Sequence, residues 1–256
     1  MLFGAIRTLH GLVVKFQPHL IVAVFDGKPT KQRQLYPEYK HGRPAKASGF
    51  RKQLRDVRRV FRALGIVVIR DPNSEADPIV SALAGWFTQV HKFRVTIVSS
   101  DSDYFQCLER GVVMYDAIRQ RTLTKPYVLS RFGVRTLGQY VLLKSIIGDR
   151  SDNIPPVKRG VGPKTAAKIV TNHDEYAKFS MAHAKALKRN FQLIMLPQSF
   201  INTPSWVLQK LRRHRRVRSG AVKRILRKYE VRSVLTGFKT WCLPFRKLAV
   251  TKIKLP

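Results

Sequence analysis

The sequence predicts an α/β fold: an open, mostly parallel sheet flanked by helices, then a helix-hairpin-helix module and a basic, helical C-terminus. The first observation is an alternation of short apolar runs with amphipathic segments. The runs 20–25 (LIVAVF), 66–69, 93–98 and 112–115 have the length and composition of buried strands. The second is that acidic residues follow strand ends, where the sites of such sheets gather. The third is the helical character of the sequence from residue 137 onward.

The helical segments between these runs carry apolar residues at helical spacing. Segment 2–16 is apolar on one face, which predicts an amphipathic core helix rather than a targeting segment. Segment 50–64, ended by Gly65, and segment 79–90 follow the same pattern. The polar, basic stretch between 27 and 49 is too long for an ordinary connection, so we expect it to be functional or mobile.

Charge limits the classes of function that fit. The 256 residues include 49 Lys and Arg against 15 Asp and Glu, a formal net charge of +34. Such an excess predicts a polyanionic partner. A membrane surface is the rival to nucleic acid, but no apolar run approaches the ~20 residues of a spanning helix. With only two cysteines, the sequence does not predict a fold held together by disulfides, and it fits a reducing compartment.

Seven of the 15 acidic residues fall into four short groups at the starts of turns. These are Asp26, Glu75 with Asp77, Asp101 with Asp103, and Asp149 with Asp152. Carboxylates at one sheet edge repel each other unless a cation neutralises them, and Mg²⁺ prefers oxygen ligands. Two such ions about 4 Å apart can activate water and stabilise the leaving oxygen of a phosphodiester. Turn or helix capping is the alternative for each group alone, but four groups in so acid-poor a chain favour metal.

Segment 157–170 (VKRGVGPKTAAKIV) is a candidate phosphate-binding hairpin. Gly160 and Gly162 form a tight turn before a helix N-terminus that carries Lys164 and Thr165. Free backbone N–H groups at such a terminus bind phosphate. The alternative is a plain connection between two helices, but the nearby GDRSDNIP favours the phosphate site.

Two further basic segments are candidate nucleic-acid contacts. YPEYKHGRP (36–44) places Tyr39 beside Lys40 and Arg43, a combination that suits base stacking and phosphate neutralisation, with a solvated loop as the alternative. Between residues 210 and 228, ten of nineteen residues are Lys or Arg. Their density favours a phosphate-contacting arm over a solubilising face. The candidates there are Arg212, Arg213, Arg215 and Arg216.

Taken together, these segments resemble the 5′-3′ exonuclease and flap endonuclease family, found in phage exonucleases and at the N-terminus of bacterial DNA polymerase I. The matching motifs occur in family order: AVFDG, YPEYKHGRP, SEADPIV, IVSSDSDYFQCL and LKSIIGDRSDNIPPVKRGVGPKTAAKIV. The resemblance extends from about residue 3 to 234 and implies a PIN-like nuclease core. It implies a division into 1–140 (the core, with an arch segment at about 27–50), 141–200 (the helix-hairpin-helix DNA-binding region) and 201–256 (the basic C-terminal segment).

The resemblance also implies roles for the candidate residues. The seven grouped carboxylates would bind two Mg²⁺ ions, with Mn²⁺ as a substitute. Lys40 and Arg43 would lie at the base of a helical arch that grips the 5′ strand, and would stabilise the scissile phosphate. Gly160, Gly162, Lys164 and Thr165 would hold duplex DNA, with a K⁺ ion as a further candidate. The implied substrates are 5′-flap or 5′-ended DNA and RNA primers, bound by a monomer in the cytoplasm, the nucleoid or an organelle matrix.

Four features depart from the family pattern, and one of them is a net charge far beyond what this fold requires. The family begins with a strand ending in an Asp that binds the catalytic metal, and we expect this chain to be N-terminally truncated after it. Pro78 stands where a second Asp is usual, and the hairpin carries Pro156 and one extra residue. The sequence thus leaves two hypotheses: a metal-dependent 5′-3′ exonuclease, and a catalytically weak or inactive relative that binds nucleic acid in a nucleoprotein assembly. Retention of the seven carboxylates favours the enzyme, because a pure binding protein gains nothing from repelling its own ligand.

Overall fold

The computed structural model describes residues 1–44, 47–109, 111–197, 205–212 and 216–250. Its internal contacts divide the chain into two compact units that alternate along the sequence. Unit 1 comprises Met1–Phe25, Pro44–Arg70 and Thr203–Pro256, and unit 2 comprises Asp26–Arg43 and Asp71–Asn202. The division at 140 and 200 implied by the resemblance concerns segments of sequence and stays a prediction.

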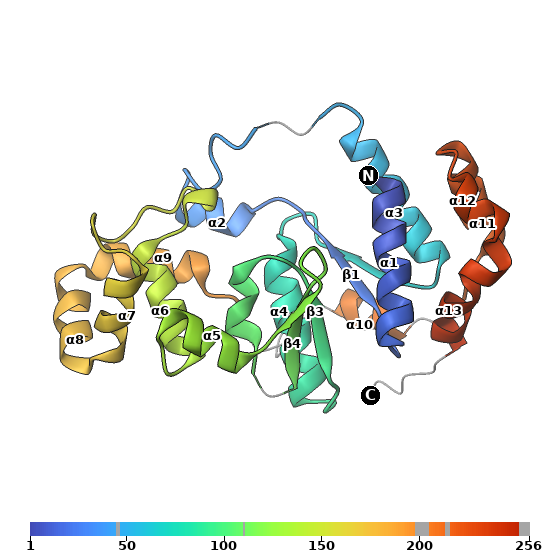
Figure 1. Ribbon diagram of the computed structural model, residues 1–256. Helices are drawn as coiled ribbons and strands as arrows, with labels where there is room; N and C mark the ends of the chain where they lie inside the picture. The colour runs from blue at the N-terminus through green and yellow to red at the C-terminus, as the bar shows by residue number, and fades with distance from the viewer. Residues whose placement is uncertain (45–46, 110, 198–204, 213–215, 251–256) are drawn as a thin grey trace. The chain divides into compact units, whose positions relative to one another are not determined.

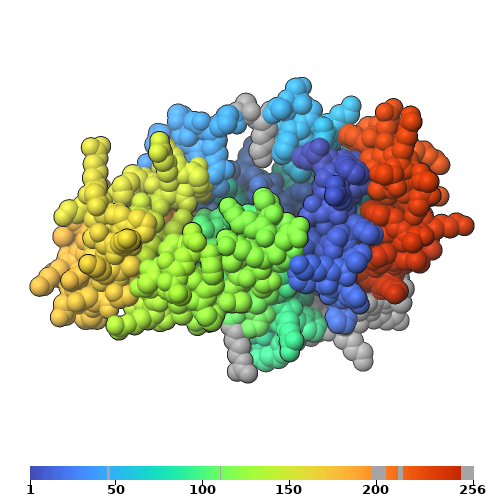
Figure 2. All heavy atoms as spheres, viewed as in Figure 1, coloured from blue at the N-terminus to red at the C-terminus, as the bar shows by residue number. Residues whose placement is uncertain are grey.

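Unit 1 is a helical layer around a two-stranded sheet. Strand β1 (Val22–Phe25) pairs in parallel with β2 (Val67–Arg70). The helices are α1 (Leu2–Phe16), α3 (Phe50–Ala63), α10 (Ser205–Arg212), α11 (Ser219–Lys228), α12 (Arg232–Thr236) and α13 (Phe238–Val250). In Figure 2 the N-terminal helix (dark blue) and the C-terminal helices (red) form one continuous surface. Helix α1 and the C-terminal helices therefore share one face of this unit.

The core of unit 1 follows from the amphipathic pattern of α1. The helix buries Leu2, Ile6, Leu9 and Val13, four residues at the spacing of one helical face, as predicted. They pack with buried residues of α3, α11 and α13 in a single apolar cluster. The basic, helical C-terminus is therefore confirmed as helical, and its apolar face belongs to the same core as α1.

Unit 2 holds a three-stranded sheet with a group of helices. Strand β3 (Val95–Val98) pairs in parallel with β4 (Val112–Asp116), and β4 pairs antiparallel with β5 (Arg121–Leu123). The α-helices, the later ones gathered together in Figure 1, are α2 (Thr30–Leu35), α4 (Ala76–Gln89), α5 (Lys125–Phe132), α6 (Leu137–Ile147), α7 (Pro163–Thr171), α8 (His173–Ala182) and α9 (Ala184–Ile194). Two 3₁₀ helices complete it, η1 (Ser102–Cys107) and η2 (Arg150–Asp152).

The α/β class is confirmed, whereas several details of the expected sheet are corrected. The strands form two sheets, and β1 is half-buried along its length rather than buried. Neither β5 nor α5 was predicted, since β5 has three residues and α5 lies before the segment expected to be helical. Helix α4 begins at Ala76, ahead of the predicted 79, and includes Pro78 in its first turn. Proline is tolerated there because the N–H groups of the first turn have no partner within the helix.

The polar, basic segment 27–49, predicted to be functional or mobile, contains the short helix α2 (Thr30–Leu35). In the described part of the chain, no helix is both long and apolar enough to cross a membrane.

Candidate functional site

All seven carboxylates singled out from the sequence lie in unit 2, where Asp26 directly follows β1 and the other six lie in or beside the first turn of a helix. Glu75 occupies the N-cap of α4, and Asp77 lies in its first turn. Asp101 caps η1 and is followed by Asp103, and Asp149 caps η2, which contains Asp152. We call the set the acidic cluster: Asp26, Glu75, Asp77, Asp101, Asp103, Asp149 and Asp152.

The members of the acidic cluster form one connected group. Asp26 accepts the backbone N–H of Ala76 at 2.9 Å, which fixes it beside the start of α4. Asp77 is close enough to Asp26 and Asp101 for their charges to act on its carboxyl group. In the same way, the charges of Asp101, Asp149 and Asp152 act on the carboxyl group of Asp103. The fold thus assembles carboxylates that are up to 126 positions apart in the sequence.

Three basic side chains partly neutralise the acidic cluster. The Lys40 ammonium contacts Glu75 and lies 3.4 Å from Asp152 Oδ2, and Arg43 pairs with Asp152. Lys144 Nζ lies 2.9 Å from Asp149 Oδ2 and 3.4 Å from Asp103 Oδ1. The cluster therefore carries more negative than positive side chains.

Tyr39 corrects an expectation from the sequence. Its side chain was assigned to base stacking, but the residue is only 4% exposed, so its ring cannot receive a base in this arrangement. Its hydroxyl lies 2.9 Å from Glu75 Oε2 and 2.8 Å from Asp152 Oδ2, and donates its proton to one of them at a time. Tyr39 therefore joins two carboxylate groups of the cluster.

The segment that carries Lys40 is held against the 149–154 loop by backbone contacts as well. The Lys40 N–H donates to the Asp152 carbonyl at 2.9 Å, and Asn153 Nδ2 donates to the Glu38 carbonyl at 2.8 Å. Gly148 allows the loop to close: its φ is +72°, and a Cβ there would lie 2.4 Å from the Ile154 carbonyl oxygen. These contacts fix Lys40 and Arg43 beside Asp152.

The pKa values of the cluster reflect burial and repulsion. Burial, followed by repulsion from Asp101, Asp149 and Asp152, raises the pKa of Asp103 to about 6 despite the nearby Lys144. Burial raises the pKa of Asp77 too, with repulsion from Asp101 and Asp26 as further causes. The Lys144 pKa is also raised, because Asp103 and Asp149 together outweigh the opposing effect of its burial. Because Lys144 is shared by Asp103 and Asp149, it only partly neutralises Asp103.

The donor atoms of the acidic cluster suit a hard divalent ion. All seven side chains offer oxygen, and the buried Asp103 Oδ1 accepts no hydrogen bond. Within the described ranges, no three His, Cys, Asp or Glu side chains converge on one ion position. The cluster is therefore an open array rather than a closed cage, which is compatible with Mg²⁺, an ion that usually keeps several waters.

The capping interpretation also holds for two of the groups. Asp101 Oδ1 accepts the backbone N–H of Asp103 at 2.9 Å, and Asp149 Oδ1 accepts that of Ser151 at 2.8 Å. In Asp149 the second oxygen, Oδ2, is the one that contacts Lys144. Capping and ion binding are compatible, because a cap uses one carboxylate oxygen and orients the other.

The predicted hairpin follows η2 and leads into α7, which packs against α6. Gly160 has φ +82°, a conformation that favours glycine, and Gly162 is the N-cap of α7 without a capping side chain. Lys164 and Thr165 follow in the first turn and are exposed. The hairpin therefore presents a helix N-terminus and a cation to solvent. Of the C-terminal candidates, Arg212 and Arg216 are exposed, and Arg213 and Arg215 lie outside the described residues.

Sequence reasoning missed two residues of the site. Lys144 lies in the apolar helix α6, and the signal was a single cation within LGQYVLLKSII. The Tyr104 hydroxyl donates a hydrogen bond to Asp77 Oδ1, but an aromatic residue after DSD gives no sign of a polar role.

Comparison with known sequences gives a family match and several relatives. Residues 1–133 match the family described as the 5′-3′ exonuclease, N-terminal resolvase-like domain. The 5′-3′ exonuclease of Aquifex aeolicus is 31% identical over 202 residues, which cover 75% of this chain and 68% of that protein. DNA polymerase I of Treponema pallidum is 37% identical over 172 residues, 66% of this chain but 17% of the polymerase. The chain thus spans less than a fifth of this polymerase's length.

Among solved structures, the flap endonuclease D15 of bacteriophage T5, crystallised with DNA and metal ions, has a similar fold. The TM-score is 0.61 at 19% sequence identity, and the match covers 86% of this chain and 88% of that one.

Proposed function

Because the chain belongs to the 5′-3′ exonuclease family, we propose that it hydrolyses phosphodiester bonds of DNA at 5′ ends or 5′ flaps with the help of two Mg²⁺ ions. The observation that carries this proposal is the connected acidic cluster, whose charges are incompletely neutralised by Lys40, Arg43 and Lys144. Mn²⁺ would substitute for Mg²⁺.

All seven members of the acidic cluster are proposed to hold the ions. When bound, such ions activate water and stabilise the leaving oxygen. The resident lysines and Tyr39 keep the carboxylates together: Tyr39 reaches Glu75 and Asp152, and Lys144 reaches Asp103 and Asp149. These hydrogen bonds and ion pairs restrict the rotamers of the carboxylates, so little reorganisation is needed when substrate binds.

Lys40 and Arg43 are proposed to bind the scissile phosphate. Arg43 is half-exposed, with its guanidinium anchored on Asp152 and its Nε 3.1 Å from the Ser151 carbonyl oxygen. An anchored guanidinium retains further N–H donors for a phosphate oxygen. The Lys40 ammonium, near Asp152, would act as a positive point charge where negative charge develops.

The hairpin is proposed to hold duplex DNA through Gly160, Gly162, Lys164 and Thr165, with K⁺ as a candidate ion there. Its support is the uncapped N-terminus of α7, where backbone N–H groups meet solvent. Gly162→Asp tests it: no atom lies within 4 Å of a Cβ at this position, so the variant should fold. Its carboxylate would cap the helix and repel phosphate, so duplex affinity should fall in a gel-shift assay. Unchanged affinity would make the hairpin a plain connection.

Arg212, Arg213, Arg215 and Arg216 are proposed to add backbone contacts. RNA primers are a further proposed substrate, and the protein is proposed to act as a monomer in the cytoplasm, the nucleoid or an organelle matrix. The named relatives are an exonuclease and a polymerase, so the comparisons give no support to the purely nucleic-acid-binding alternative.

Single-turnover cleavage of a labelled 5′-flap DNA tests the proposed function. The chain should cleave with Mg²⁺ and not with EDTA, and Asp101→Asn should lose about a hundredfold or more in rate because a metal-binding carboxylate is removed. Asp174→Asn is the matched control, since Asp174 is an exposed acid of the same unit outside the acidic cluster. Equal cleavage by both variants would contradict the proposal and indicate a contaminating nuclease.

A further inference from the structure

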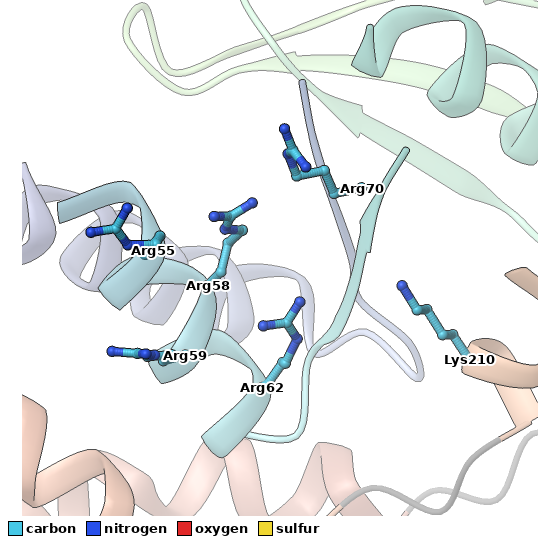
Figure 3. A pocket seen from close by; sticks show the side chains of 6 residues that line it. All are labelled: Arg55, Arg58, Arg59, Arg62, Arg70 and Lys210. Atoms are coloured by element: carbon cyan, nitrogen blue, oxygen red, sulfur yellow. The ribbon is translucent and has the colours of Figure 1, made fainter. Parts of the chain in front are cut away.

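Unit 1 contains a cavity of about 300 Å³ whose lining residues, in the described chain, are all cationic. Four come from α3, one from the end of β2 and one from α10, as Figure 3 shows. We call it the arginine pocket: Arg55, Arg58, Arg59, Arg62, Arg70 and Lys210. None of the seven carboxylates of the acidic cluster belongs to this unit.

The fold fixes the arginine face of α3. Residues three, four and seven positions apart share a helix face, so Arg55, Arg58, Arg59 and Arg62 form one row. The opposite face is held in the core by Val57 and Val60, which are 3% and 0% exposed. Because the core sets the rotation of α3, the guanidinium groups are placed together before any ligand arrives.

The positive charges gathered in the pocket repel one another. Burial, followed by repulsion from Arg70, Arg62 and Arg55, lowers the pKa of the Arg58 guanidinium. One pocket residue, Arg59, pairs with the buried Asp56 at 3.1 Å, and Asp56 is shared with Lys228 at 2.6 Å. Like charges that repel in this way do not stabilise a fold, so the row is better explained by an anionic ligand.

We propose that the arginine pocket is a further nucleic-acid contact, which binds the phosphodiester backbone of a strand and adds affinity without taking part in bond cleavage. The proposal rests on the proposed function only for the identity of the polyanion. Guanidinium groups bind phosphate oxygens through paired N–H donors, and five of the six lining residues are arginine. No aromatic or amide side chain is among these residues, so the contact reads phosphate and not base.

Free polyphosphate shares this chemistry, but the row on α3 favours a strand. Arg55 and Arg62 are seven residues apart, which is about 10 Å along a helix. Phosphates of one strand advance about 3.4 Å each along duplex DNA, so the row spans several successive phosphates.

The test measures how the affinity for 5′-flap DNA depends on salt, by fluorescence anisotropy in EDTA, so that cleavage plays no part. The double variant Arg55→Gln/Arg62→Gln removes two charges and keeps apolar stem length over the helix. These two residues are exposed, so the variant should fold. The matched control, Arg7→Gln/Arg232→Gln, removes the same charge from exposed positions of unit 1 outside the pocket.

The double variant should bind about tenfold to hundredfold more weakly near 0.1 M salt, and the slope of log K against log salt should become shallower by about 1.4 to 1.8, as expected for two lost phosphate contacts. The control should keep a slope close to that of the unmodified chain. Equal slopes for the two double variants would overturn the proposal. A thermal shift with tripolyphosphate that only the pocket variant loses, with its DNA slope unchanged, would also overturn it and indicate a small-anion site. Because binding is measured without cleavage, an inactive chain would contradict the proposed function and leave this result interpretable.

Discussion

The acidic cluster of unit 2 and the arginine pocket of unit 1 each gather like charges. In each region, burial and repulsion disfavour the charged form of one side chain. The Asp103 pKa rises to about 6, through burial and then repulsion, and the Arg58 pKa falls for the same two reasons. They differ in their counter-charges. Lys40, Arg43 and Lys144 cross-link the acidic cluster. Beside the arginine pocket, the buried Asp56 pairs with Arg59 and is shared with Lys228.

This difference fits two kinds of ligand. Catalysis needs reacting groups held within fractions of an ångström, and a network of internal hydrogen bonds supplies that order. Binding a phosphate backbone needs mainly charge, so a row of arginines on one helix suffices. Changing the counter-charges should therefore affect the two regions in different ways.

The largest effect is expected at Lys40. Lys40→Met keeps most of the side-chain length but removes the positive charge near Glu75 and Asp152, so single-turnover cleavage should slow by about 10²–10³-fold. Divalent-ion affinity should not weaken, because a competing cation has left the carboxylates. Lys125→Met is the control, since Lys125 pairs with Glu109 at an exposed site of the same unit. Equal rates for both variants would mean that Lys40 only supports the fold.

A smaller effect, on stability, is expected at Asp56, the paired acid of unit 1. Hydrogen bonds from Lys228, and then from Tyr229 and Arg59, lower its pKa below the ordinary 3.8. Asp56→Asn should therefore lower the free energy of unfolding by about 1.5–3 kcal/mol at pH 7, measured by urea denaturation.

The pH dependence of this effect has a definite sign. Because the folded pKa is depressed, the stabilisation is present above about pH 3.8 and is lost as pH falls through the folded value. The gap between the two proteins should close at that acidic end. Glu230→Gln, at an exposed acid of the same unit, should show no gap. A gap constant down to pH 2 would remove ion pairing as its cause.

The smallest effect is expected at Asp103, with the opposite sign. Because burial and three neighbouring carboxylates disfavour its charge, Asp103→Asn should raise the stability of the metal-free protein by about 1–2 kcal/mol. Millimolar Mg²⁺ should reverse the order, because the unmodified chain then gains the free energy of ion binding. A loss of stability in the metal-free variant would contradict this prediction. It would mean that the ion pair of Asp103 with Lys144 outweighs the repulsion from the neighbouring carboxylates.

Much of this picture could be predicted from the sequence. Apolar periodicity located α1, α3 and the strands β1 to β4, because burial requires those patterns wherever the elements pack. The grouping of acids in a basic chain identified the carboxylates that the fold assembles. Their roles as metal ligands stay a prediction.

The sequence could not show which side chains are exposed or which distant side chains form pairs. Tyr39 looked like a stacking residue because nothing local shows that its hydroxyl meets Asp152, 113 positions away. Lys144 was hidden because its partners Asp103 and Asp149 are brought to it by tertiary packing. The arginine pocket depends on β2 and α10 joining α3, a contact between segments that only the fold specifies.

Anomalous scattering from crystals grown with Mn²⁺ tests most directly whether the acidic cluster is a metal site. Mn²⁺ accepts the same oxygen ligands as Mg²⁺, and its scattering locates it without any assay of activity. We expect two peaks about 4 Å apart, within coordination distance of carboxylates that include Asp101 and Asp103, and their loss in Asp101→Asn but not in Asp174→Asn. Crystals saturated with Mn²⁺ that show no peak beside Asp101 or Asp103 would contradict this assignment.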